Sequence, residues 1–250
     1  MPEEHFLGTV SDKHLSLGVL DSRMSVAIAQ ALMGDLRGQE DREKALHVAK
    51  YMKTSALNFL GIQIPQIRKT ARKHIRGFAV DKLPQIMDLL WKEEVFDFRL
   101  AAIEIMEEYS AKGDKSVALQ MISDMIDDID TWALTDPLCI VCLGTLLIRD
   151  WSIEKTIASW RRSENFWRRR ATVLPYQHLS KKGVHKPEYT ERILSALKPH
   201  LSDREFFVGK AVGWVLRELS KREPETVRGY IEENRAQMTK LAIREASKRL

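Results

Sequence analysis

The chain has 250 residues, 44% of them hydrophobic and 30% charged, which is the composition of a folded, water-soluble protein with room for a sizeable core. Its formal charge of +5 is unevenly spread: residues 151–250 hold 22 Lys and Arg against 12 Asp and Glu, a net of +10, which leaves −5 for residues 1–150. A basic half indicates a surface for a polyanion, although an ordinary solvated surface has the same composition.

The two cysteines and the N-terminus point to a reducing compartment inside the cell. Cys139 and Cys142 form a C-x-x-C, but neither the strand–turn–helix setting of a redox motif nor a second zinc-ligand pair accompanies them. We therefore expect two buried helical cysteines, no disulfide, no metal and no cofactor. The N-terminus lacks the features of a signal peptide, and the apolar run 138–148 is too short to span a bilayer. We expect a cytoplasmic protein.

From Met24 onward, apolar residues recur with helical spacing, and no run of strand alternation is present. Residues 1–22 predict a loosely ordered N-terminal extension, and residues 23–250 a single folded domain. Pro65 is well placed in the first turn of a helix. The predicted helices cover residues 24–36, 40–52, 65–75, 82–91, 95–109, 115–126, 131–148, 153–161, 165–180, 188–197, 203–220, 224–233 and 238–248.

A weak internal repeat runs through these helices. Its equivalent positions are spaced by 35, 35 and 40 residues, and an aromatic residue precedes three of them by four positions. This period predicts an all-α fold, a curved solenoid of HEAT-like helical-hairpin repeats. One position breaks the pattern with an aspartate where the others have alanine, as expected at a functional site. The positions are Ala101, Asp136, Ala171 and Ala211, and the aromatic residues are Trp132, Trp167 and Phe207.

The segment from Thr131 to Asp136 is the main candidate for a site. On a helix, Trp132 and Asp136 project from one face, four residues apart. Two structural alternatives remain. Asp136 followed by Pro137 is also a common helix start, with the aspartate as N-cap. Trp132, like Trp167, has the spacing of a core aromatic residue.

Two basic segments follow. Residues 161–170 hold five arginines against one glutamate, and Arg168 and Arg169 are candidates for contacts with DNA phosphates. Lys210, Trp214 and Arg217 stand at helical steps and form a cation–aromatic–cation stripe that suits a nucleic-acid groove. A solvated basic helix and a half-buried Trp between snorkelling cations are the structural alternatives.

Several motifs, in order, resemble the DNA alkylation repair glycosylases of the AlkD family, from about residue 27 to the C-terminus. Each motif is weak alone, and their order and spacing make the resemblance specific. They are Tyr51-Met52-Lys53, Phe59-Leu60-Gly61-Ile62-Gln63-Ile64-Pro65, Trp132-x-x-x-Asp136, Phe166-Trp167-x-x-Arg170-Ala171 and Lys210-Ala211-Val212-Gly213-Trp214-Val215-Leu216-Arg217-Glu218.

The resemblance implies a solenoid whose concave basic face binds duplex DNA. The sequence has no coiled-coil heptad, and we expect a monomer. The resemblance also implies excision of positively charged N3- or N7-alkylated purines, such as 7-methylguanine and 3-methyladenine, without base flipping. By position, Trp132 and Trp214 would hold the deoxyribose of the lesion. Asp136 would stabilise the oxocarbenium ion and orient water, and Arg170 would grip the phosphate backbone. Further DNA contacts are implied at Tyr51, Gln63 and Arg217.

The residues suit this chemistry. An alkyl group at N3 or N7 leaves the purine positively charged, so the departing base needs no general acid. A carboxylate beside an indole surface can stabilise the cationic sugar electrostatically. Two other functions stay open: a non-catalytic HEAT-repeat DNA-binding protein, and a HEAT-type protein-interaction solenoid, for which steeply salt-dependent DNA affinity would not be expected.

Overall fold

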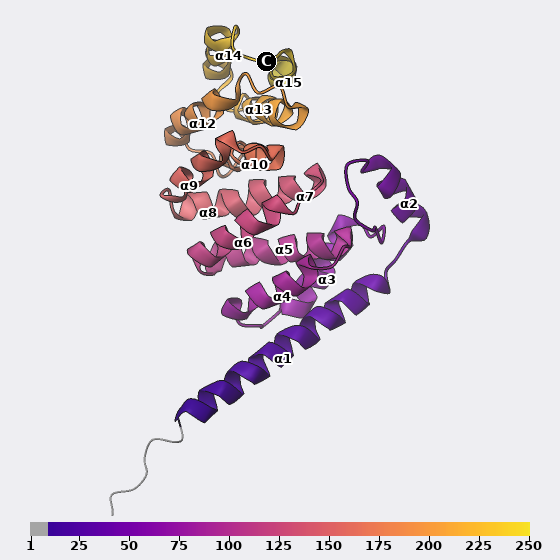
Figure 1. The fold of residues 1–250 in the computed structure, drawn as a ribbon. Helices are drawn as coiled ribbons and strands as arrows, with labels where there is room; N and C mark the ends of the chain where they lie inside the picture. The colour runs from indigo at the N-terminus through magenta and orange to yellow at the C-terminus, as the bar shows by residue number, and fades with distance from the viewer. Residues whose placement is uncertain (1–9) are drawn as a thin grey trace, which may run out of the picture. The chain divides into compact units, whose positions relative to one another are not determined.

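The computed structural model describes the backbone of residues 10–250 and the side chains of residues 22–250 (Figure 1). Regular secondary structure in this part of the chain is helical, apart from an isolated bridge between Asn58 and Val95. The predicted all-helical class is therefore confirmed. The chain divides into two compact units, the first ending at Tyr109 and the second running from Ser110 to Leu250.

The first unit begins its helices earlier than predicted. α1 starts at Val10 rather than at Met24, so the backbone of residues 10–22 belongs to this helix. Residues 1–9, the rest of the predicted extension, lie outside the described residues. The helices are α1 (Val10–Arg37), α2 (Arg42–Tyr51), α3 (Ile64–Ile75), a 3-10 turn (Val80–Lys82), α4 (Leu83–Trp91) and α5 (Phe96–Lys112), whose last turn crosses into the second unit.

A buried aspartate holds the connector before α3. Asp97 is 2% exposed and accepts hydrogen bonds from the backbone amides of Leu60 (2.7 Å) and Ile62 (3.1 Å). These bonds satisfy amides that no helix provides for. The connector leads directly into α3, where Pro65 lies in the first turn, as predicted.

The second unit is a succession of helical pairs in which α10 packs against α7 and α13, and α13 against α15 (Figure 1). The predicted helix 165–180 is interrupted before Pro175, because the proline ring clashes with a helical carbonyl four residues earlier. Short 3-10 turns lie at Trp160–Arg162, Pro187–Tyr189, Lys198–His200 and Ser247–Arg249. The helices are α6 (Lys115–Asp127), α7 (Trp132–Pro137), α8 (Gly144–Arg149), α9 (Ile153–Ser159), α10 (Phe166–Ala171), α11 (Pro175–Leu179), α12 (Thr190–Leu197), α13 (Phe206–Leu219), α14 (Pro224–Asn234) and α15 (Lys240–Ala246).

A π-helical turn, Leu138–Leu143, joins α7 to α8. The continuous stretch Trp132–Arg149 is long and apolar enough to cross a bilayer by length and composition, in contrast to our expectation from its apolar core alone. Most of it is buried inside the protein, as in the central helix of a folded domain. Cys139 and Cys142 are both buried there, as predicted.

Because of two histidines in this unit, we expect the free energy of unfolding to depend on pH. His178 is half-buried against Gly144, and the Nε2 of buried His200 lies 2.6 Å from Thr172 Oγ1. Burial lowers the pKa of each imidazole from 6.5 to about 4. Between these pH values the unfolded chain binds more protons, so the free energy of unfolding falls as the pH falls, by up to about 3 kcal/mol per histidine. Urea denaturation at pH 4.5 and pH 7 should show this loss.

The paired substitution His178→Gln and His200→Gln is the control for that prediction. It removes both imidazoles, so the free energy of unfolding should differ less between the two pH values than it does in the wild type. Part of the difference in the free energy of unfolding should remain, because carboxylates titrate in the same pH range. A difference as large as in the wild type would contradict the assignment to these histidines.

Candidate active site

Trp132 and Asp136 lie on one helix. Thr131 is the N-cap of α7: its Oγ1 accepts a hydrogen bond from the amide of Ala133 (3.4 Å). The hydroxyl of Thr135 donates back to the Thr131 carbonyl (3.0 Å). Because the helix begins at Trp132, Asp136 is inside it, and the alternative in which Asp136 caps a helix is wrong. The two side chains therefore project from the same face, as predicted.

Pro137 shapes the backbone directly after Asp136. It lies inside the helix and has no N–H for the carbonyl four residues earlier, so a regular α-helix cannot continue unchanged through it. The chain widens into the π-helical turn Leu138–Leu143 before α8 begins. Such turns are often found at functional sites. Asp136 thus lies at a junction between two helical geometries.

Asp136 and Arg170 form a buried, two-pronged ion pair. Arg170 Nε donates to Asp136 Oδ1 and Arg170 Nη2 donates to Oδ2, both at 2.9 Å. Arg170 Nη1 donates to the backbone carbonyl of Phe207. Arg170 is 3% exposed and Asp136 9%. Each charge compensates the other away from water, and the planar guanidinium fixes the orientation of the carboxylate.

The electrostatics of Asp136 result from opposing influences. Burial raises the pKa of Asp136 above its ordinary carboxyl value, and the positive charges of Arg170 and Lys210 oppose that rise. The bidentate hydrogen bonds match the geometry of an ionised carboxylate, which accepts at both oxygens. Burial, together with the nearby Asp136, raises the pKa of Cys139, so this residue stays a neutral thiol. Asp136 is the ionised acidic group of this buried cluster.

The three residues of the predicted stripe on α13 differ in exposure and in their partners. Lys210 is exposed, and its Nζ lies 5.4 Å from the centre of the Phe206 ring. Trp214, one helical turn later, is half-buried. Arg217 instead donates to Glu245 Oε2 on α15 (2.8 Å), which ties α13 to α15. The charge of Lys210 acts on Asp136, whereas Arg217 is held in a structural ion pair.

Arg168, predicted as a DNA contact, also has intramolecular partners. Its Nε and Nη2 donate to the carboxylate of Asp127 at the end of α6, and its Nη2 lies 3.1 Å from Ser123 Oγ. Its guanidinium stands 5.2 Å from the centre of the Trp160 ring. A DNA phosphate would have to compete with these contacts, so the DNA-binding role of Arg168 stays a prediction.

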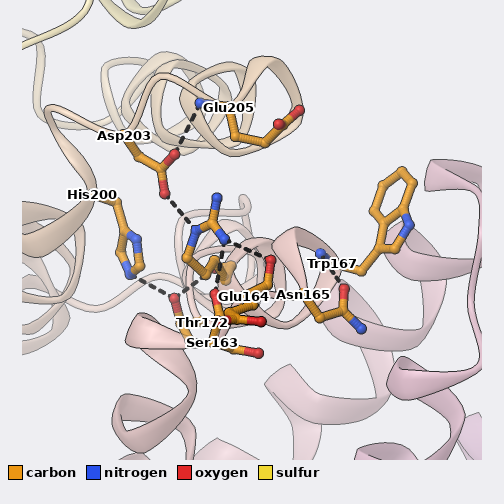
Figure 2. A network of polar contacts seen from close by, with 9 residues as sticks. Ser163, Glu164, Asn165, Trp167, Thr172, His200, Asp203 and Glu205 are labelled. Carbon is orange, nitrogen blue, oxygen red and sulfur yellow. Dashed lines mark hydrogen bonds and ion pairs between the residues drawn. The ribbon is translucent and has the colours of Figure 1, made fainter.

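Arg169 lies within a polar network between the start of α10 and the start of α13. Its Nε donates to Asp203 Oδ2 (2.8 Å), and its Nη1 donates to the carbonyls of Ser163 (2.8 Å) and Glu164 (3.1 Å). Figure 2 shows Asp203 also accepting from the backbone amide of Glu205 (2.9 Å). This arrangement holds two loops together, and the predicted DNA contact of Arg169 remains untested.

The substitution Arg169→Met should therefore destabilise the protein. It removes an ion pair and two carbonyl hydrogen bonds and leaves Asp203 without its guanidinium, at a cost of about 2 kcal/mol. Urea denaturation measures this loss, with Lys182→Met, on an exposed residue, as the control. If Arg169 served mainly to bind phosphate, stability would be kept, and the salt dependence of duplex binding would weaken instead.

Two predicted site residues lie in the first unit. Tyr51 is 68% exposed at the end of α2. Gln63 is exposed at the N-cap of α3, where its backbone amide donates to Gln66 Oε1 (3.3 Å). Gln63 therefore has a local role in starting a helix. Their predicted DNA contacts remain predictions.

Sequence reasoning missed Phe207 as part of the site. It acts through its backbone carbonyl, the third acceptor for Arg170, and its ring packs 4.8 Å from that of Trp167. The only sequence signal was its aromatic position in the repeat. Among residues 22–250, no group of three or more His, Cys, Asp or Glu side chains is arranged to hold a metal ion.

The fold and this cluster define a class: an all-helical repeat protein with a buried carboxylate–guanidinium pair. A half-buried tryptophan shares the helix of the carboxylate, and an exposed lysine shares the helix whose Phe207 carbonyl accepts from the guanidinium. Residues 32–250 match the family described as DNA alkylation repair enzyme, and the chain belongs to this family. The resemblance drawn from the motifs is thereby confirmed at the level of the family.

Two solved structures show the same fold. The first, a predicted DNA alkylation repair enzyme from Enterococcus faecalis, is 22% identical, with a TM-score of 0.71 over 85% of this chain and 97% of its own. The second, AlkD2 from Streptococcus mutans, is 18% identical, with a TM-score of 0.59 over 82% of this chain and 98% of its own. These similarities confirm the helical-repeat fold. No curated protein matches the sequence.

Proposed function

We propose that this protein is a DNA glycosylase that hydrolyses the N-glycosidic bond of positively charged N3- or N7-alkylated purines in duplex DNA, without flipping the base. Its products would be the free alkylated base and an abasic site. Family membership supports a role in DNA alkylation repair, and the arrangement around Asp136 supports this particular reaction.

The observation that carries the proposal is the fixed orientation and the burial of the Asp136 carboxylate. Its carboxylate is held in a fixed orientation, largely out of water, on the helical face that it shares with half-buried Trp132. A preoriented charge in a low-dielectric setting acts more strongly on a nearby developing charge than one in water does. Asp136 is therefore suited to stabilise a sugar cation and to orient the attacking water.

The chemistry of the leaving base explains why one carboxylate can suffice. Alkylation at N3 or N7 makes the purine cationic, so it departs as a neutral base and needs no proton. The transition state concentrates positive charge on the deoxyribose, which Asp136 would stabilise. The half-buried rings of Trp132 and Trp214 would offer apolar surfaces to the sugar.

One observation favours a second candidate function, a non-catalytic DNA-binding protein of the same fold. Both oxygens of Asp136 already accept hydrogen bonds from Arg170, as they would in a purely structural ion pair. The two functions differ in one measurable respect: both require duplex binding, and only the glycosylase releases base.

The deciding experiment is to incubate the protein with a duplex that contains a single 7-methylguanine and to measure free base and abasic sites. We expect base release under single-turnover conditions. Duplex binding without release would support the non-catalytic function. Absence of salt-dependent duplex binding would contradict both and support a protein-interaction solenoid.

A further inference from the structure

Two cations, Arg170 and Lys210, act on the charge of Asp136, and they differ in whether a DNA phosphate can reach them. Three donors of Arg170 already have acceptors, two on Asp136 and one at the Phe207 carbonyl, and the Arg170 side chain is 4% exposed. A phosphate could bind this guanidinium only after the ion pair opened and left a carboxylate buried without its partner. That exchange is unfavourable, because a buried charge without its partner is not compensated.

Lys210 has the opposite character. It is exposed, and no carboxylate among residues 22–250 pairs with its ammonium, which lies over the Phe206 ring. It belongs to the same helix as Phe207, whose carbonyl binds Arg170, and its charge acts on Asp136. Lys210 is therefore a cation of the site that a DNA phosphate can reach without breaking an existing ion pair.

We propose that these cations have separate roles: Arg170 is a positioning residue that orients and keeps ionised the Asp136 carboxylate, and Lys210 binds the DNA phosphate at the lesion. This assignment rests on the proposed function. It differs from the role that the family resemblance implied for Arg170, which was to grip the backbone.

The separation also solves an electrostatic problem. A free ammonium near Asp136 opposes the positive charge that develops on the sugar during base release. When a phosphate pairs with Lys210, that opposition is cancelled, and the carboxylate acts on the sugar unopposed from this side. No phosphate pairs with Arg170 in this assignment, but its charge is already balanced by the two oxygens of Asp136.

The test compares Lys210→Met with Arg170→Lys, using a duplex with one 7-methylguanine. Each phosphate contact contributes about 0.9 to the slope of log affinity against log salt concentration. Lys210→Met should lower that slope by about 0.9 and raise the duplex concentration needed for the half-maximal rate. Arg170→Lys should keep the slope. Lys182→Met, which removes an exposed charge elsewhere, is the matched control and should also keep it.

Arg170→Lys keeps the charge but loses the two-pronged geometry, so the saturated single-turnover rate should fall at least tenfold, and further than in Lys210→Met. Arg170→Gln removes the charge as well. Because the charge of Arg170 opposes the upward shift of the Asp136 pKa, the acid limb of its rate–pH profile should move to higher pH. A merely structural role would lower the active fraction without moving this limb.

The assignment is overturned if an Arg170 variant lowers the salt slope while Lys210→Met leaves it unchanged. If the Arg170 variants do not fold, Lys210→Met and Lys210→Arg still decide, since the arginine should restore the slope. If wild type releases no base, the proposed glycosylase fails, but the salt slopes still show which cation binds phosphate.

Discussion

Asp136→Asn is expected to abolish most base release while leaving duplex binding intact. Asparagine has the same shape as aspartate but no charge, so it cannot stabilise a sugar cation electrostatically. Removing a preorganised group of this kind costs about 100- to 1000-fold in rate. The measurement is the single-turnover release of 7-methylguanine at saturating protein, alongside duplex affinity for wild type and variant.

A matched control separates chemistry from stability. Asp136→Asn leaves Arg170 buried without its counter-charge and should lower the melting temperature, so folding must be verified at the assay temperature. Asp127→Asn removes another aspartate from an arginine pair, with Arg168, at a more exposed place. It should keep the rate of base release. If Asp136→Asn also kept that rate, Asp136 would be only a structural partner.

The rate of the wild type should depend on pH through the same carboxylate. Because burial raises the pKa of Asp136, protonation should begin above the ordinary carboxyl range. The active form is the carboxylate, so base release is lost as the pH falls through the pKa of the folded protein and is retained above it. Asp136→Asn should lack this acid limb.

Gly213→Ala is expected to lower the stability of the folded protein. A Cβ atom at Gly213 would lie 2.5 Å from Glu245 Cβ, 2.7 Å from the Ala242 carbonyl oxygen and 3.2 Å from the Ala246 amide. Two of these atoms are backbone atoms of α15, so relief requires the two helices to separate. Overpacking of this kind costs about 1–3 kcal/mol, and the shift of α13 should also displace neighbouring Trp214.

Thermal denaturation measures this effect. At about 2–4 °C per kcal/mol for a chain of this size, Gly213→Ala should lower the melting temperature by several degrees. Gly229→Ala is the control: it lies within α14, with nothing within 4 Å of its added Cβ. That substitution should raise stability slightly, because alanine favours helix. An unchanged melting temperature in Gly213→Ala would contradict the close packing of α13 on α15.

The helical class and the shared face of Trp132 and Asp136 could be predicted, because both follow from local periodicity. Apolar spacing identifies helices wherever one face is buried, and a four-residue step places two side chains together on any α-helix. Local pattern left one alternative open, because Asp136 followed by Pro137 is also a common helix start. In the folded protein the helix begins one residue after Thr131, which is its N-cap, and Asp136 lies inside it.

The carboxylates with which the arginines pair come from parts of the chain that are distant in the sequence. Residues 161–170 resemble one basic surface in the sequence, yet Arg168, Arg169 and Arg170 bind the carboxylates of Asp127, Asp203 and Asp136, 34 to 41 residues away. A carboxylate compensates a guanidinium only where helical packing brings them together and excludes water. Local pattern identified Asp136 and Arg170 separately, and the folded chain made them a pair, because neither charge is stable in that interior without the other.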